Sequence, residues 1–258
     1  MIEITSLQNQ RVKRLLNLQQ KSKLRKETGL FVIEGLREIE RALVSGYQAE
    51  ELWVSDENIP LKKHLWRDTQ VVKCSKPVFE KLTYRENNAG LVGVFRSKLH
   101  RLDALKPIEN PIYVVVEGVE KPGNLGAILR TCNGLGADAL FVCDSSVDIY
   151  NPNVVRNSLG ALFNTPIVQS TTKEAITYFK ANNIQIVCAY LPGSITYTQV
   201  DYKKPTALVL GAEDIGLTDE WVKNTNAKCV IPMHGVVDSL NVSVATAIFL
   251  AEAIRQRI

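Results

Sequence analysis

The sequence contains few of the residues from which metal and disulfide sites are built. Only three histidines occur among its 258 residues, and its five cysteines are scattered and form no Cys-x-x-Cys pair. A structural zinc site needs four such ligands at close spacing, and a disulfide framework needs paired cysteines. We therefore expect no bound metal and five reduced thiols, as is typical of cytoplasmic proteins.

Long apolar runs are also missing. No stretch reaches the roughly 20 apolar residues that span a bilayer, and the first residues, MIEITSLQNQ, hold no apolar signal core. The composition, with 45% hydrophobic and 22% charged residues, is typical of a globular protein. We therefore expect a globular, cytoplasmic protein without a membrane partner.

Positive charge is concentrated in the first part of the chain. Residues 1–98 hold 18 Lys and Arg against 12 Asp and Glu, whereas residues 99–258 hold 13 against 15. Such a basic region can neutralise nucleic-acid phosphates. A solvated basic helix is the simpler interpretation of the charge pattern alone. The cations near the start are Arg11, Lys13, Arg14, Lys23, Arg25 and Lys26.

Hydrophobic periodicity predicts a small α/β domain, a polar linker and a larger α/β domain. The first is predicted to have helices at 6–26, 36–44, 61–68 and 76–82 and strands at 30–33, 51–54, 70–72 and 90–96. The second is predicted to have strands at 112–116, 139–142, 184–189, 207–210 and 228–231 and helices at 125–135, 153–162, 173–181, 219–224 and 242–257. The strands of the second domain are almost wholly apolar, which favours a parallel sheet covered on both faces.

A first polar cluster, residues 117–131, follows the first strand of the second domain. Gly123 and Gly126 flank a predicted helix start with Asn124 as N-cap. Neither GxGxxG nor GxxxxGK[ST] is present, which disfavours a dinucleotide or P-loop site. Arg130 lies in an apolar run, and a buried arginine needs an anionic partner. That partner is either a structural carboxylate or a phosphate, which matches the guanidinium fork.

Two further polar clusters follow later strands. Residues 211–218 combine two glycines, which permit close backbone approach to a ligand, with the carboxylates Glu213 and Asp214. Residues 238–241 offer hydrogen-bonding side chains, and helix capping is the simplest role for Ser239. No cluster holds a Ser/His/Asp set, a metal set or a nucleophilic cysteine. The inventory therefore favours chemistry that works chiefly by positioning the reactants.

Together these clusters resemble the three motifs of the SpoU (TrmH) family of RNA ribose 2′-O-methyltransferases, in the SPOUT superfamily. The order and spacing agree across roughly residues 111–258. Residues 30–35 and the helix after them resemble the ribosomal-protein-like domain that precedes the catalytic domain in many members. Asp214 departs from the pattern, because many members carry glycine there. The matching segments are residues 124–131 (NLGAILRT), 208–217 (LVLGAEDIGL), 231–235 (IPMHG) and 239–245 (SLNVSVA).

The resemblance implies a fold in three parts. Residues 1–98 would form a small α/β RNA substrate-binding domain, residues 99–110 a linker, and residues 111–258 a methyltransferase domain whose parallel sheet ends in a trefoil knot. It also implies S-adenosylmethionine (SAM) as methyl donor and a homodimer through the C-terminal domain. Three apolar side chains of the last helix would then be covered by the knot or by the partner subunit: Val244, Ile248 and Leu250.

The resemblance further implies roles for single residues. The cofactor would be held by Leu210, Gly211, Ile231, Met233, Leu240 and Asn241. The catalytic set would be Arg130, Asn124, Glu213, Ser239 and Asn241. Arg130 is a poor base because the pKa of a guanidinium is very high, so a phosphate or late proton loss has to assist it. The cations Arg11, Lys13, Arg14, Lys23, Arg25 and Lys26 would contact RNA.

The RNA itself is not specified by these motifs. A ribosomal-protein-like first domain favours ribosomal RNA, of the large subunit, over transfer RNA, by analogy within the family. A tRNA 2′-O-methyltransferase and a non-catalytic RNA-binding protein of the same fold are the alternatives. A nicotinamide-dependent oxidoreductase is disfavoured by the missing GxGxxG motif.

Overall fold

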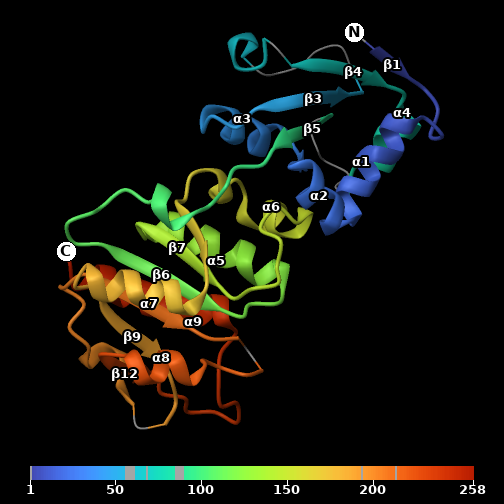
Figure 1. The fold of residues 1–258 in the computed structure, drawn as a ribbon. Coiled ribbons are helices and arrows are strands. Elements are labelled where there is room, and N and C mark those ends of the chain that lie inside the picture. Colours follow the sequence, from blue (N-terminus) through green and yellow to red (C-terminus); the bar gives the residue numbers. More distant parts are fainter. Residues whose placement is uncertain (1, 56–61, 68, 85–89, 193, 213) are drawn as a thin grey trace. The chain divides into compact units, whose positions relative to one another are not determined.

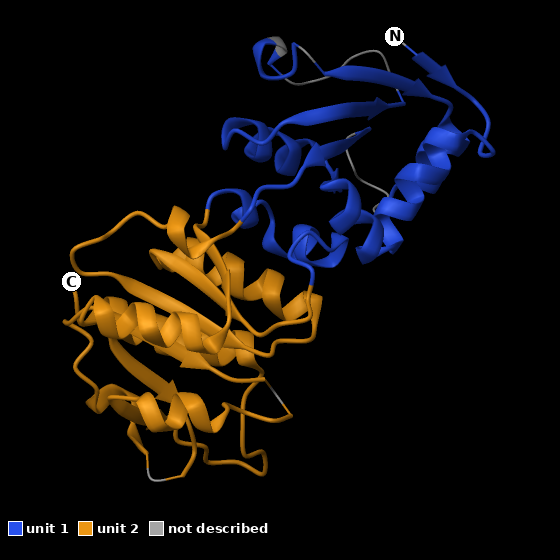
Figure 2. Ribbon diagram, viewed as in Figure 1, with its two compact units in different colours: residues 1–99, 148–164 blue, residues 100–147, 165–258 orange. Residues whose placement is uncertain are grey.

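The chain folds into two compact units (Figures 1 and 2). The computed structural model describes residues 2–55, 62–67, 69–84, 90–192, 194–212 and 214–258. Unit 1 combines Met1–Leu99 with Asp148–Asn164, and unit 2 combines His100–Val147 with Thr165–Ile258. Residues 148–164 thus belong to unit 1, although they lie within the stretch predicted as the methyltransferase domain.

Unit 1 is built on a mixed five-stranded sheet with the strand order β1-β4-β3-β5-β2. The strand β4 pairs in parallel with β1 and β3, whereas β5 runs antiparallel to β2 and β3. The three-residue β1 was not predicted, because so short a strand shows no periodicity. The strands are Ile2–Ile4 (β1), Leu30–Glu34 (β2), Ala49–Val54 (β3), Gln70–Cys74 (β4) and Leu91–Arg96 (β5).

The helix predicted over residues 6–26 is two helices, because Lys21 leaves the helical conformation with φ −109° and ψ 106°. Asn9 caps the first of them by accepting the amide of Arg11 at 2.9 Å. The helix predicted over residues 61–68 is a single 3-10 turn, Lys63–Leu65, and its two predicted ends lie outside the described residues. The helices are Gln10–Gln20 (α1), Ser22–Thr28 (α2), Leu36–Val44 (α3) and Lys76–Leu82 (α4).

The segment of residues 148–164 completes the aromatic core of unit 1. The ring of Tyr150 lies 4.3 Å from that of Phe31, and the ring of Phe163 lies 5.1 Å from that of Tyr47. The helix predicted over residues 153–162 ends early, because Leu159 adopts φ 50° and the next residue φ 87°. The segment therefore forms α6 (Pro152–Ser158) and a 3-10 turn, Ala161–Phe163.

Unit 2 is built on a seven-stranded sheet with the order β10-β12-β9-β11-β6-β7-β8, and all its strand pairs are parallel. The predicted parallel sheet is therefore confirmed, and the short strands β8 and β10 were missed. The strands are Ile112–Glu117 (β6), Ala139–Cys143 (β7), Ile167–Ser170 (β8), Gln185–Ala189 (β9), Ile195–Thr196 (β10), Thr206–Leu210 (β11) and Ala227–Val230 (β12).

Helices cover both faces of this sheet (Figure 1). On one face α7 and α8 share a core with Tyr113 and Phe141 of the sheet, filled by Phe179 and Trp221. On the other face α9 lies against α5, β11 and β6, so the chain returns from β12 near the sheet edge to its centre. The helices are Pro122–Leu135 (α5), Thr172–Ala181 (α7), Asp219–Asn224 (α8) and Val242–Arg255 (α9).

The predicted linker is largely part of unit 2. From His100 onward its residues belong to that unit, and Leu102 and Leu105 pack against the core under α7 and α8. Within the described ranges the longest helices, α5 and α9, have 14 residues each, which is too short to cross a bilayer.

Candidate functional site

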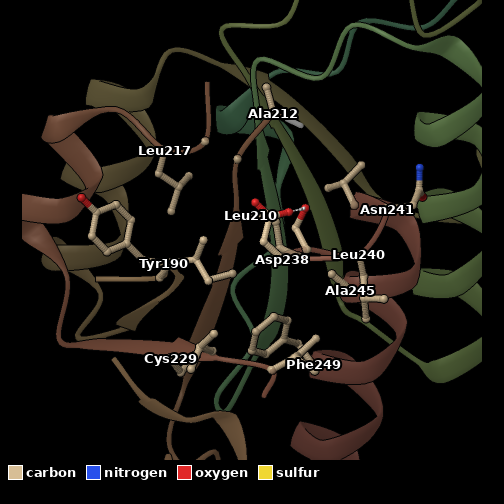
Figure 3. A pocket seen from close by; sticks show the side chains of 18 of the residues that line it. Tyr190, Leu210, Ala212, Leu217, Cys229, Asp238, Leu240, Asn241, Ala245 and Phe249 are labelled. Atoms are coloured by element: carbon tan, nitrogen blue, oxygen red, sulfur yellow. Dashed lines mark hydrogen bonds between the residues drawn. The ribbon is translucent and has the colours of Figure 1, made fainter. Parts of the chain in front are cut away.

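A pocket of about 680 Å³ opens at the carboxyl ends of β9, β11 and β12 (Figure 3). Its walls come from residues 189–192, from the described residues between 210 and 217, from residues 229–231 and Met233, and from residues 238–242, Ala245 and Phe249. Parallel strands deliver their ends to one edge, where open α/β sheets bind ligands. All six residues predicted to hold the cofactor line this pocket: Leu210, Gly211, Ile231, Met233, Leu240 and Asn241.

The loop after β11 folds tightly back on itself. A Cβ atom added to Gly211 would lie 2.2 Å from the carbonyl carbon of Gly216 and 2.6 Å from the nitrogen of Leu217. The amide of Gly216 donates to the carbonyl of Ala212 at 2.9 Å, and its φ of +71° favours glycine. The loop is therefore a wall that exists before any ligand binds.

The pocket walls are mostly apolar. Side chains such as Leu240 and Phe249 line them, with Asp214 and Asp238 as the only charged groups among the described lining residues. Cys229 also lines the pocket, but burial raises the pKa of its thiol to about 12, so the thiol stays protonated and is no nucleophile. Such walls suit an apolar or cationic ligand that is held by shape and backbone groups.

Two asparagines meet beside the pocket. Asn241 is the N-cap of α9, because its side-chain oxygen accepts the amide of Ser243 at 3.0 Å. Its Nδ2 atom donates to Oδ1 of Asn124 at 3.2 Å. The prediction that Asn124 caps its own helix is wrong, because α5 already begins at Pro122 and Asn124 lies in the first turn. The asparagine pair thus joins the starts of α5 and α9.

Ser239 and Glu213 complete the predicted polar set in the second and third motifs. Ser239 lines the pocket, and its hydroxyl donates to Oδ1 of Asp238 at 3.4 Å. Asn241 caps α9 instead, so the interpretation of Ser239 as a helix cap is wrong. Glu213 lies outside the described residues.

Arg130 lies on α5, six residues after Asn124, and its side chain is exposed. The structural alternative, a buried arginine with a carboxylate partner, is wrong, because the helical period turns Arg130 to solvent while Leu129 and Cys132 face the core. Within the part of the chain that is described, its guanidinium makes no hydrogen bond or ion pair. The guanidinium of Arg130 is therefore accessible to a ligand.

The N-terminal cations of unit 1 fall into three groups: exposed lysines, arginines close to Glu51, and the buried Arg25. Lys13, Lys23 and Lys26 are exposed. Arg11 lies 3.8 Å and Arg14 3.6 Å from the Glu51 carboxylate, so both guanidinium groups are partly neutralised.

Arg25 is the member of this cationic set that the structure removes from the surface. Its side chain is 3% exposed, and its Nε atom lies 2.6 Å from Oδ2 of Asp148. Its Nη1 atom also donates to the carbonyls of Leu18 and Gln19. The prediction that Arg25 contacts RNA is therefore dropped, because its donors are already used inside unit 1.

Sequence reasoning missed two features of this region. The wall formed by Tyr190 and Leu191 was not predicted, because the segment after β9 is largely apolar and carries no cluster of polar residues. The buried carboxylate of Glu117, at the end of β6, was seen in the first cluster but given no role. No group of three His, Cys, Asp or Glu side chains among the described residues is placed to hold a metal ion.

Known proteins match the chain along nearly its whole length. A family model for the SpoU rRNA Methylase family matches residues 111–251, more than half of the chain. The chain belongs to the SpoU rRNA methylase family. A second model, for the MRM3-like substrate binding domain, matches residues 9–93. The predicted resemblance is therefore confirmed in both of its parts.

Single relatives show the same agreement. A 23S rRNA (guanosine(2553)-2'-O)-methyltransferase of Bacillus subtilis is 28% identical, over 97% of this chain and 98% of the relative. A 23S rRNA (uridine(2479)-2'-O)-methyltransferase of Streptomyces viridochromogenes is 30% identical, over 91% and 85%. The crystal structure of an AdoMet-bound rRNA methyltransferase from Sinorhizobium meliloti has a TM-score of 0.91 at 34% identity, covering 99% and 98%. These relatives confirm the predicted SPOUT-type α/β fold class.

Proposed function

We propose that this SpoU family member is a SAM-dependent methyltransferase that modifies a ribose 2′-hydroxyl of RNA. One observation carries the proposal: the second and third family motifs meet in a single pocket that all six predicted cofactor residues line, and Asn241 at its edge hydrogen-bonds Asn124 of the first motif. The pocket's size and largely apolar walls are those of a small-molecule site. The Gly211 backbone packs so closely against the backbone of Gly216 and Leu217 that no Cβ fits there, which holds this wall of the pocket in place.

The residues present fit SAM and the reaction expected of it. We assign the cofactor to Leu210, Gly211, Ile231, Met233, Leu240 and Asn241. When bound, SAM supplies an activated methyl group on a sulfonium. The protein's task is then to align the 2′-oxygen with that methyl carbon, which is a matter of positioning.

The polar residues around the pocket supply that positioning. We propose that Asn124 and Asn241, which are already hydrogen-bonded, orient the ribose, and that Ser239 and Glu213 organise the same site. Arg130 binds the RNA phosphate next to the target ribose, because its exposed guanidinium offers a bidentate fork. Because a guanidinium is a poor base, the 2′-hydroxyl proton is either removed with help from that phosphate or lost late in methyl transfer.

The substrate we propose is ribosomal RNA of the large subunit. The two relatives named above are both 23S rRNA methyltransferases, and the first domain matches a substrate-binding family model. We assign RNA binding to unit 1, through the exposed Lys13, Lys23 and Lys26 with Arg11 and Arg14 beside them. Transfer RNA is the alternative substrate, and a cytoplasmic location follows from either.

We further propose that the C-terminal unit forms a homodimer. Leu250 is buried and Ile248 half-buried, but Val244 is 47% exposed, so the cover predicted for it is not supplied within one chain. On the neighbouring α5, Leu135 is 37% exposed. A partner subunit packed on α5 and α9 would cover both. The return of α9 to the sheet centre fits the knotted threading that the family resemblance implies.

Two measurements test the proposed function. Calorimetry should show that the isolated protein binds SAM, and labelled methyl should pass from SAM to ribosomal RNA faster than to bulk transfer RNA. SAM binding without transfer to any RNA would favour the non-catalytic alternative. Faster labelling of transfer RNA would keep the activity and overturn the substrate.

A further inference from the structure

Glu117 is a buried carboxylate at the carboxyl end of β6, in the centre of the unit 2 sheet. It does not line the pocket, and no role was predicted for it. A buried carboxylate is costly unless hydrogen-bond donors surround it. Three donors, at the starts of α7 and α8, surround the Glu117 carboxylate.

Two threonines bring these donors to Glu117. The Thr218 amide donates to Oε2 at 2.8 Å, and the Thr218 hydroxyl donates to Oε1 at 2.8 Å. The Thr172 hydroxyl donates to the same Oε1 atom, also at 2.8 Å. Hydrogen bonds to a charged acceptor are roughly twice as strong as neutral ones. Glu117 therefore ties the end of β6 to the starts of α7 and α8.

Thr218 is also the end of the pocket loop. The loop starts at Gly211, directly after β11, and its last residues before Thr218 line the pocket. One end is fixed by strand pairing of β11, and the other is fixed by the two bonds of Thr218 to Glu117. Thr172, in contrast, begins α7 and does not line the pocket.

The same strand end leads directly into α5, which carries Asn124 and Arg130. Gly118 follows Glu117 with φ +63°, and a Cβ placed on it would lie 3.6 Å from the Cβ of Ala212. Glu117 thus stands where the loop after β11 meets the turn that starts α5. A small second cavity of about 50 Å³ lies between these segments, lined by Asn124, Ala212 and Ile215 among others.

We propose that Glu117 is a positioning residue for the methyl donor. It holds Thr218 and, through it, the pocket loop in the conformation that receives the cofactor, at a fixed distance from α5. This inference rests on the proposed function, since it takes SAM to be the ligand of the pocket. Glu117 touches neither cofactor nor RNA, and its effect reaches them through Thr218.

The chain offers a matched pair of variants to test this role. Thr218→Val and Thr172→Val each remove one hydroxyl bond of 2.8 Å to the same oxygen, but only Thr218 ends the pocket loop. Thr218→Val should raise the Kd for SAM about threefold to tenfold, as the loss of one such hydrogen bond would. Thr172→Val should leave that Kd within about twofold. Glu117→Ala should raise the Kd for SAM more than tenfold. Glu117→Gln keeps the shape of the side chain, so its Kd for SAM should lie between those of the wild type and Glu117→Ala.

Melting temperature and a kinetic split separate positioning from general stability. The KM for SAM should rise in Thr218→Val, whereas kcat at saturating SAM and the KM for RNA should stay near wild type. If the two threonine variants change SAM affinity equally, or if neither changes it, the role of Glu117 is overturned. The proposed function still holds in that case as long as the wild-type protein binds SAM. If wild-type protein binds no SAM, the proposed function fails and this inference fails with it.

Discussion

The proposed donor side and acceptor side of the site differ in how much of them one chain builds. The pocket after β9, β11 and β12 has walls on several sides, and its tightest loop is fixed at Gly211 and Thr218. Arg130, which we assign to the RNA phosphate, is exposed. The lysines assigned to RNA in unit 1 are exposed as well.

We therefore expect donor binding and methyl transfer to be separable in this protein. A preformed pocket binds its ligand without waiting for RNA, because little remains to be ordered. The guanidinium of Arg130 and the exposed ammonium groups of unit 1 are accessible to RNA phosphates. Changes on the donor side should therefore alter the SAM Kd, and changes on the acceptor side should alter turnover or RNA affinity.

Arg130→Ala should give the largest separation of the two sides. Turnover should fall about a hundredfold to a thousandfold, the usual loss when one charge-stabilising donor is removed from a transition state. The SAM Kd should stay within about twofold, because Arg130 does not line the pocket. Single-turnover transfer and calorimetry measure the two quantities. Full activity in this variant would remove Arg130 from the mechanism.

Gly211→Ala should act on the opposite side of the comparison. Its Cβ would lie 2.2 Å from the Gly216 carbonyl carbon, so the loop backbone has to move. Overpacking of this kind costs about 1–3 kcal/mol, which corresponds to roughly a tenfold to hundredfold weaker SAM affinity. Gly134→Ala is the matched control, since an added Cβ at that helical glycine meets no atom within 4 Å. An unchanged SAM Kd in Gly211→Ala would show that the loop is not the donor wall.

Asn241 joins the two sides and should show a smaller, divisible effect. Asn241→Ser keeps an N-cap for α9 but cannot reach Asn124, whereas Asn241→Ala loses both functions. Loss of one hydrogen bond, about 1 kcal/mol, should slow transfer about fivefold in both variants. Only Asn241→Ala should also lose the roughly 1 kcal/mol of stability that a cap provides. Equal thermal stability of the two variants would argue against the capping role.

Neighbouring cations of unit 1 provide the mildest test of the acceptor side. Lys26→Ala should weaken RNA binding about twofold to threefold and lower the salt dependence of binding by about one unit, without loss of stability. Arg25→Ala should instead destabilise unit 1 by about 3 kcal/mol, because it leaves Asp148 buried without its partner. Filter binding over a salt series and denaturant unfolding measure these effects. If Lys26→Ala and Arg25→Ala changed RNA affinity and unfolding free energy alike, the assignment of Lys26 to the surface and Arg25 to the core would be contradicted.

The sheet and loops of the donor side could be predicted from the sequence by local rules, whereas its six cofactor residues were implied by the resemblance to the SpoU family. Apolar strands predicted the parallel sheet of unit 2. Gly211 was predicted to permit close approach of a ligand, and the structure shows that it contacts the backbone of its own loop. Arg130 and Arg25 could not be placed in this way. Arg130 has apolar neighbours in the sequence but is exposed, because the helical period places it on the solvent side of α5. Arg25 lies in a charged stretch but is buried, because it pairs with Asp148, 123 residues away in the sequence.

The position of the transferred methyl group is the most direct test of the proposed 2′-O-methylation. RNA labelled by the wild-type protein and radioactive SAM is hydrolysed in alkali, which cleaves next to free 2′-hydroxyls but not next to methylated ones. We predict that the label appears in alkali-resistant dinucleotides and that Arg130→Ala lowers it about a hundredfold or more while SAM still binds. Label in mononucleotides would show methylation of a base and would contradict the proposed reaction.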